Sequence, residues 1–234
     1  MTVPGRVSES IPPSRYASLV ALLDTTYEAT TTVAAALDDD TASSGTRTDW
    51  TARELLFHQL CDAQRALIVL TTAPPGPPDT DAVTYWSAWA PGTDEAAAHA
   101  RYVARAAAAY SRTAGLVAQW TDTSRAAVRS AAARSGTDLV VTQGHVIEAA
   151  DFVHTLIVEA VVHHLDLTLE LPSPGLPDAA YGCVLEVLTG LLGSPLPSTW
   201  SPREAALKGT GRLPVSTADA HELGELASHF PLFG

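Results

Sequence analysis

Apolar residues recur at helical spacing along most of the chain, and this pattern predicts a mostly helical protein. Proline- and glycine-rich runs separate the segments that carry the spacing. The stretch at 139–147 alternates imperfectly between apolar and polar residues and contains Gly144, so we expect extended chain or a short strand there. The predicted helices cover residues 13–38, 51 to the proline-rich run at 73–79, 95–120, 123–134, 149–170, 179–192 and 217–229. The fold class is therefore expected to be all-α.

Some segments are expected to be non-helical connections. Residues 41–48 consist largely of Ser, Thr and Gly, and the three aspartates at 38–40 are expected to end the first helix in solvent. The prolines of 171–177 are expected to stop the helix that precedes them. The final part of the chain is expected to contain one turn-rich connection and then the helix at 217–229.

The start of the second predicted helix is defined by a capping box. The side chain of Thr51 can accept a hydrogen bond from the Glu54 amide, while the Glu54 carboxylate accepts one from the Thr51 amide. Trp50 can pack onto Leu55 as a hydrophobic staple. This start fixes the helical phase of the residues that follow, including His58.

A carboxylate and an imidazole lie one turn apart in the apolar helix at 149–170. Glu159 and His163 fall within about 40° of each other on one helical face. Their neighbours are Leu, Ile, Val and Ala, and leaving polar groups without partners there would cost several kcal/mol. His58 completes a set of two imidazoles and one carboxylate, which Zn²⁺ takes with one coordination position left open. The sequence therefore predicts a divalent-metal site at His58, Glu159 and His163. The alternative, in which each is a lone polar residue with an ordinary partner, is disfavoured because the three occur together.

Neighbours of these ligands have two interpretations each. Cys61 is either a fourth ligand or, as is commoner for a helix cysteine, a packing residue. Asp62 and Asp166 lie within a turn of a predicted ligand and either orient an imidazole or face solvent. Arg65 either binds a carboxylate of a substrate or thiol cofactor or pairs with an acid of the bundle. The remaining histidines are not expected to bind metal: His99, His221 and His229 are interpreted as surface residues, His164 as an interface or surface residue, and His145 and His154 as lacking a partner at ligand spacing.

Composition narrows the function classes. The chain has 234 residues, is 46% hydrophobic and carries a formal net charge of −12, which disfavours binding to nucleic acid or to an anionic membrane surface. Two cysteines are too few for a disulfide framework, and the N-terminal residues lack an apolar signal core, so a cytoplasmic location is expected. No apolar run reaches the ~18 residues of a membrane span. The sequence contains no Gly-x-Ser-x-Gly stretch and no glycine-rich phosphate loop, which disfavours a serine hydrolase and a nucleotide-binding protein.

Two runs of the sequence resemble a known family. Residues 58–67 and 158–167 are similar to the metal-site helices of the DinB-like superfamily, and more narrowly to those of the mycothiol-dependent maleylpyruvate isomerase group. The resemblance covers residues 15–195, and the tail at 207–212 is also similar to the end of many members. It implies a four-helix bundle that holds a divalent metal, usually zinc, through the three ligands named above.

The resemblance also implies a function. Family members use the thiol mycothiol as a cofactor or co-substrate, and zinc lowers the pKa of a bound thiol to below neutral. The expected activity is that of a zinc-dependent transferase or isomerase in which a metal-bound thiolate adds to an electrophilic small molecule. The family isomerase has a mixed α/β domain after the bundle, whereas the residues after Pro177 have a mostly helical pattern here, which argues against maleylpyruvate itself as the substrate. The alternative is a non-catalytic metal-binding bundle that acts as a stress, sensor or partner-binding protein.

Domain organisation follows from the same resemblance. Residues 10–176 are expected to form a DinB-like metal-binding four-helix bundle, and residues 177–234 a mostly helical C-terminal extension packed on it. Such a protein is expected to meet a small-molecule thiol and an electrophilic substrate as a monomer or homodimer, with neither nucleic acid nor a membrane as a partner.

Overall fold

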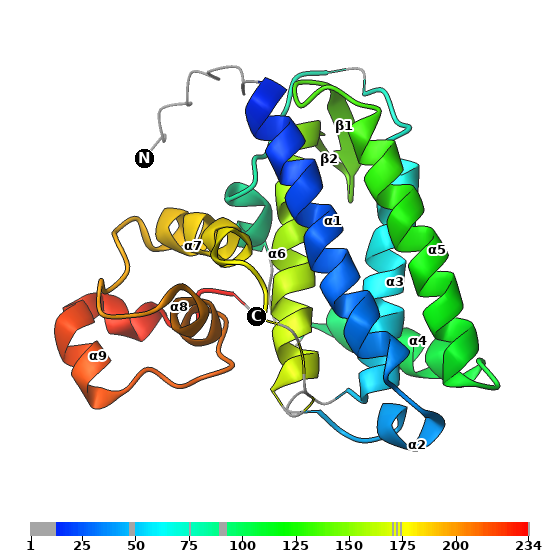
Figure 1. The fold of residues 1–234 in the computed structure, drawn as a ribbon. Helices are drawn as coiled ribbons and strands as arrows, with labels where there is room; N and C mark the ends of the chain where they lie inside the picture. Colours follow the sequence, from blue (N-terminus) through cyan, green and yellow to red (C-terminus); the bar gives the residue numbers. More distant parts are fainter. Residues whose placement is uncertain are drawn as a thin grey trace.

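Four long helices form a bundle in the computed structural model, which describes residues 13–46, 50–74, 76–88, 93–169, 171, 173 and 175–233 (Figure 1). The four helices are α1 (Pro13–Ala35), α3 (Ala52–Val69), α5 (Thr113–Ala132) and α6 (Ala149–Thr168). Helices α1 and α3 each pack against both α5 and α6, so the four enclose a common core. The predicted, mostly helical character of the chain is therefore confirmed. Residues 10–12, at the expected start of the first domain, lie outside the described residues.

Helix α6 is the central element of the fold. Residues on every side of it are buried, because α1 and α3 cover part of its circumference and α7 (Asp178–Leu192) and α8 (Pro202–Gly209) cover another part (Figure 1). An apolar pattern all round a helix is typical of such a position. Several polar residues of α6 are enclosed with the rest, and His163, His164 and Asp166 are all buried, whereas Glu159 is partly exposed.

The predicted start of α3 is confirmed. The Thr51 hydroxyl accepts a hydrogen bond from the Glu54 amide at 3.3 Å, and Glu54 Oε2 accepts one from the Thr51 amide at 2.7 Å. Trp50 packs on a small buried cluster that contains Leu55, as the staple requires. Because the cap sets where the helix begins, it also sets the direction in which His58 projects.

The predicted helix at 95–120 is wrong at its C-terminal end. The chain forms α4 (Asp94–Ala108) and then starts α5 at Thr113, so the break falls before rather than after residue 120. The backbone nitrogen and Oγ1 of Thr113 donate to Asp39 Oδ1 at 2.6 and 2.7 Å, and Arg53 Nη2 donates to Thr113 Oγ1 at 2.8 Å. A contact with a residue 74 positions upstream therefore accompanies the start of α5, and residues 109–113 contain neither proline nor glycine.

Two short helices occupy segments that were predicted as connections. Helix α2 (Asp39–Ala42) follows Asp38, whose side chain accepts a hydrogen bond from the Thr41 amide at 2.7 Å. Asp38 thus caps a new helix instead of ending the first one in solvent, while residues 47 and 48 of the predicted loop lie outside the described residues. Helix α8 follows Ser201, whose hydroxyl accepts from the Glu204 amide at 3.2 Å. Ser followed by Pro is a helix-start signal, so the sequence did contain the information for α8.

The remaining elements are short. Strands β1 (Leu139–Thr142) and β2 (His145–Glu148) pair antiparallel, which confirms the extended segment before α6. Their turn residues Gln143 and Gly144 have φ values of 50° and 87°, as a type I′ hairpin turn requires. The helix predicted at 217–229 is interrupted at Gly224. The described chain also contains the 3₁₀ helix η1 (Thr84–Ala88) and, at the C-terminus, α9 (Thr217–Leu223) followed by the 3₁₀ helix η2 (Gly224–His229). Among the described residues, the helices are all too short or too polar to cross a membrane.

Candidate metal centre

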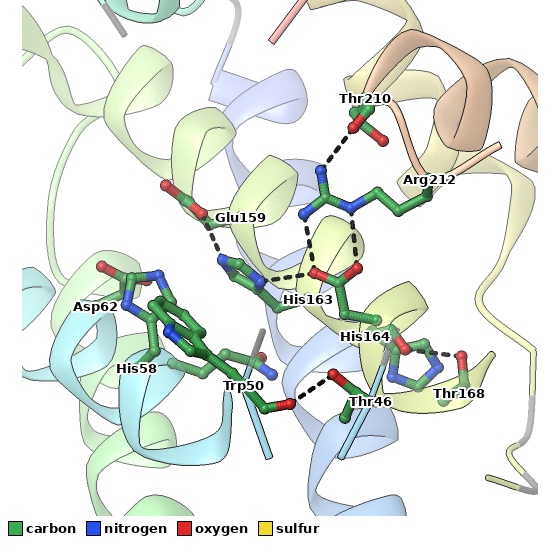
Figure 2. A network of polar contacts seen from close by, with 12 residues as sticks. Thr46, Trp50, His58, Asp62, Glu159, His163, His164, Thr168, Thr210 and Arg212 are labelled. Carbon is green, nitrogen blue, oxygen red and sulfur yellow. Dashed lines mark hydrogen bonds and ion pairs between the residues drawn. The ribbon is translucent and has the colours of Figure 1, made fainter. Parts of the chain in front are cut away.

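The three predicted ligands converge where α3 faces α6 (Figure 2). His58 extends from α3, and Glu159 and His163 extend from successive turns of α6. One ligand atom from each lies within 4.8 Å of the other two, and His163 Nε2 is 3.2 Å from Glu159 Oε2. The imidazole rings of His58 and His163 are 4.7 Å apart between centroids and nearly perpendicular, at 86°. The structure therefore brings together the residues that helical phase and spacing had grouped.

The orientation of His163 is fixed by a buried carboxylate, that of Asp166, on the side of the ring away from Glu159. Its Nδ1 atom lies 3.1 Å from Asp166 Oδ2, and the Asp166 side chain has no exposed surface. Arg212, from the segment after α8, donates to both oxygens of Asp166 at 2.9 Å each. It also donates to the Thr210 carbonyl oxygen at 2.8 Å (Figure 2). With Nδ1 held by Asp166, the Nε2 atom of His163 is the one directed at Glu159. The predicted orienting role of Asp166 thus has its geometry, whereas Arg212 was missed.

Burial and hydrogen bonds set the charges of this group. Burial alone would lower the pKa of His163, but hydrogen bonds with Asp166 and Glu159 outweigh it and raise this pKa to about 9. Burial would raise the pKa of Asp166, but its hydrogen bonds with His163 and Arg212 lower it to about 2. Burial, with the charge of His163, lowers the pKa of His58 to about 3. At neutral pH His58 is therefore neutral, and a positive charge is held between the carboxylates of Glu159 and Asp166.

Asp62 and Arg65 lie beside the predicted ligands on α3. Asp62 Oδ2 is 3.6 Å from His58 Nε2, which is beyond hydrogen-bonding distance, and this buried oxygen has no hydrogen-bond partner among the described residues. Burial, followed by repulsion from Glu159, raises the pKa of Asp62 to about 7. Arg65 Nη1 lies 3.9 Å from Asp62 Oδ1, with 37% of its side chain exposed. Of its two interpretations, the ion pair with a bundle acid is the one that these contacts display.

Two further ring side chains, from His99 and Trp50, lie near His58 and are not among the predicted site residues. The prediction that His99 is a surface residue is wrong. Its Nε2 atom lies 3.0 Å from His58 Nδ1 in a partly buried contact between α4 and α3. The Trp50 ring lies 4.8 Å from the His58 ring and 6.3 Å from the His163 ring between centroids. The staple pattern placed Trp50 at the start of α3, but His99 lies on an alanine-rich helix where no apolar spacing marks it.

The other candidates lie apart from this group. Cys61 is not among the clustered ligand residues, and burial raises the pKa of its thiol to about 11, which favours its packing interpretation. His164 is buried and its Nε2 atom lies 3.0 Å from Ser173 Oγ, so it is an interface residue. The remaining histidines lie outside the group of ligand residues: His154 Nε2 lies 2.9 Å from the Cys183 carbonyl oxygen, His145 pairs with Asp79 at 3.2 Å, and His221 and His229 are exposed.

The chemistry of the group follows from its donor atoms. Two imidazoles and a carboxylate are borderline and hard ligands of the kinds that zinc prefers, and one imidazole has the carboxylate partner that metal-bound histidines usually have. The buried Asp62 oxygen, which has no hydrogen-bond partner among the described residues, adds an unpaired acceptor beside them. The residues therefore fit a divalent cation. Comparisons with protein-family models, with curated proteins and with solved structures find no match to the chain.

Proposed function

We propose that this chain is a DinB-like metal-binding bundle that acts as a zinc-dependent, mycothiol-using transferase or isomerase. The observation that carries the proposal is the convergence of His58, Glu159 and His163 to within 4.8 Å from two packed helices. Three protein ligands of these types leave a fourth position for a small molecule, as catalytic zinc sites do. A structural zinc site would instead be closed by a fourth protein ligand.

Zinc would supply the acid chemistry of the proposed reaction, and the residues of the chain would orient its ligands. Zinc at this site would act as a Lewis acid that lowers the pKa of a thiol to below neutral. Arg212 holds Asp166 through two hydrogen bonds of 2.9 Å, and Asp166 in turn holds Nδ1 of His163 at 3.1 Å. Partners of this kind fix the orientation of a ligating imidazole and make its other nitrogen more basic. These contacts hold Nε2 of His163 toward Glu159, and a cation that binds there would displace the Nε2 hydrogen of the charged ring.

The walls of the site suit a polar thiol and a flat electrophile. Trp50 covers the His58 ring at 4.8 Å, and Tyr102, which is 51% exposed, lies 6.3 Å from the His99 ring. Their rings would offer apolar contact to a substrate on this side of the ligand group. Arg65 pairs only loosely with Asp62, at 3.9 Å, and 37% of its side chain is exposed. We therefore assign it to binding an acidic or polar group of the thiol cofactor or the substrate as well.

A thermal-shift comparison tests the thiol. Mycothiol should raise the melting temperature of the zinc-loaded protein, whereas S-methyl mycothiol, which cannot form a thiolate, should not. At 100 times its dissociation constant a ligand stabilises by ~2.7 kcal/mol. For a chain of this length that is a rise of roughly 5–11 °C. The His163→Ala variant treated in the same way serves as the control and should show no thiol-dependent shift.

Each outcome separates the possibilities. Equal shifts with both compounds would contradict thiolate binding at the metal. Zinc binding without a shift from either compound would contradict the thiol-dependent function and leave the non-catalytic metal-binding bundle. If mycothiol alone shifts the melting temperature, turnover of an electrophile that requires both zinc and mycothiol would establish the enzymatic activity.

A further inference from the structure

His99 makes a contact that the proposed ligand set does not explain. Its Nε2 atom lies 3.0 Å from Nδ1 of His58, and the two rings meet edge to face with centroids 5.2 Å apart and an angle of 74° between their planes. The two residues are 41 positions apart and come together because α4 packs on α3. Two nitrogen atoms at this distance share a hydrogen bond, so one ring carries the proton between them.

The position of that proton decides whether His58 can bind a cation through its far nitrogen. A neutral imidazole has one nitrogen that carries hydrogen and one with a free lone pair. If His58 donates from Nδ1 to His99, the Nε2 atom of His58 keeps the lone pair. If His99 donates instead, the hydrogen of His58 must be on Nε2, and that atom cannot be a ligand.

The surroundings of His58 single out Nδ1 as the nitrogen that is held by a hydrogen bond. Its Nε2 atom lies 3.6 Å from Asp62 Oδ2, which is too far for one. His163 has the same division, since its Nδ1 atom is held by Asp166 and its Nε2 atom is directed into the site. His99 therefore contacts Nδ1 of His58 in the same way that Asp166 contacts Nδ1 of His163.

We propose that His99 positions His58 for metal binding by accepting the hydrogen on Nδ1, so that Nε2 of His58 presents its lone pair to the cation. This inference rests on the proposed zinc site. His99 is a positioning residue and not a ligand, because the group of described residues whose ligand atoms lie within 4.8 Å of one another consists of His58, Glu159 and His163. Metal-bound histidines are usually held in this way through their second nitrogen.

Two substitutions at His99 test the role through zinc affinity. His99→Phe keeps a flat ring but removes the acceptor, whereas His99→Gln keeps an acceptor in its side-chain carbonyl. We expect the dissociation constant for zinc, measured by competition with a chromophoric chelator, to rise by about 10- to 100-fold in His99→Phe. The Gln variant should recover most of the wild-type affinity. His221→Phe, at an exposed position of α9, should bind zinc as wild type does.

The readouts distinguish the possible failures. Wild-type affinity in His99→Phe would overturn the positioning role. Loss of one nitrogen ligand in the X-ray absorption spectrum of zinc-loaded His99→Phe would show that His99 is a ligand, which also overturns it. Should the Phe variant fail to fold by circular dichroism, His99→Ala removes the acceptor with less bulk and carries the same expectation. If wild type itself binds no zinc, it is the proposed function that fails.

Discussion

Replacing Arg212 tests how strongly the C-terminal residues support the metal-site helix. Arg212 donates from Nε and Nη2 to the two oxygens of Asp166 at 2.9 Å each, and Asp166 has no exposed side-chain surface. Arg212→Met retains much of the apolar stem and removes both donors, which leaves His163 as the charged partner of Asp166. Removing one member of a buried ion pair costs about 3–5 kcal/mol. Because His163 still compensates part of the charge, we expect a loss of about 3 kcal/mol in the free energy of unfolding.

The loss can be measured by urea unfolding and by thermal melting. For a chain of this length, about 3 kcal/mol corresponds to a melting temperature lower by roughly 6–12 °C. Arg212→Lys, which keeps the charge but not the paired hydrogen bonds, should lose less. Arg129→Met, at an exposed position of α5, is the matched control and should change stability by less than about 0.5 kcal/mol. Equal unfolding free energies for Arg212→Met and Arg129→Met would refute the reasoning.

Three further substitutions test the elements that carry the site. Thr51→Ala removes the cap of α3 and should lower the free energy of unfolding in urea by about 1 kcal/mol; an unchanged value would contradict the cap. Gly209→Ala places a Cβ atom against the Leu188 side chain and should destabilise by about 1–3 kcal/mol in the same assay, whereas Gly182→Ala, which meets open space on α7, should not destabilise. First burial and then repulsion from nearby acids raise the pKa of Asp151 from 3.8 to about 6, so its contribution to stability is fully present below pH 3.8 and is lost as the pH rises through 6. The melting temperature of Asp151→Asn should therefore rise relative to that of wild type as the pH increases from 4 to 7. A difference in melting temperature that stays constant over this range would contradict the reasoning.

Local patterns predicted the elements whose boundaries have local causes. The capping box of Thr51 and Glu54 lies within one turn, so α3 could be placed from the sequence alone. The start of α5 could not, because the partner of Thr113 is Asp39, in a different part of the chain. An alanine-rich run has helix propensity throughout, and a tertiary contact is needed to interrupt it. Helix α8 is a different case: Ser201 and the proline after it are a local start signal, but they lie in the segment predicted as a turn-rich connection.

The residues of the candidate site differ in the same way in how far the sequence predicts them. Glu159 and His163 share a helical face at a spacing of four, and Asp166 lies one turn further on, so all three could be grouped by periodicity. Arg212 and His99 reach the site from segments far away in the sequence, and neither belongs to a pattern that identifies its partner. Ligands on one helix are therefore predictable from spacing, whereas the residues that orient them from other elements require the three-dimensional structure.

The zinc content of the purified chain tests the central claim most directly. After loading with zinc and removal of the excess, elemental analysis of wild type should give about one zinc ion per chain. His58→Ala, Glu159→Ala and His163→Ala should each hold far less, while His145→Ala, at an exposed histidine paired with Asp79, should retain the wild-type content. Equal zinc in wild type and in the three ligand variants would contradict a metal centre at this position.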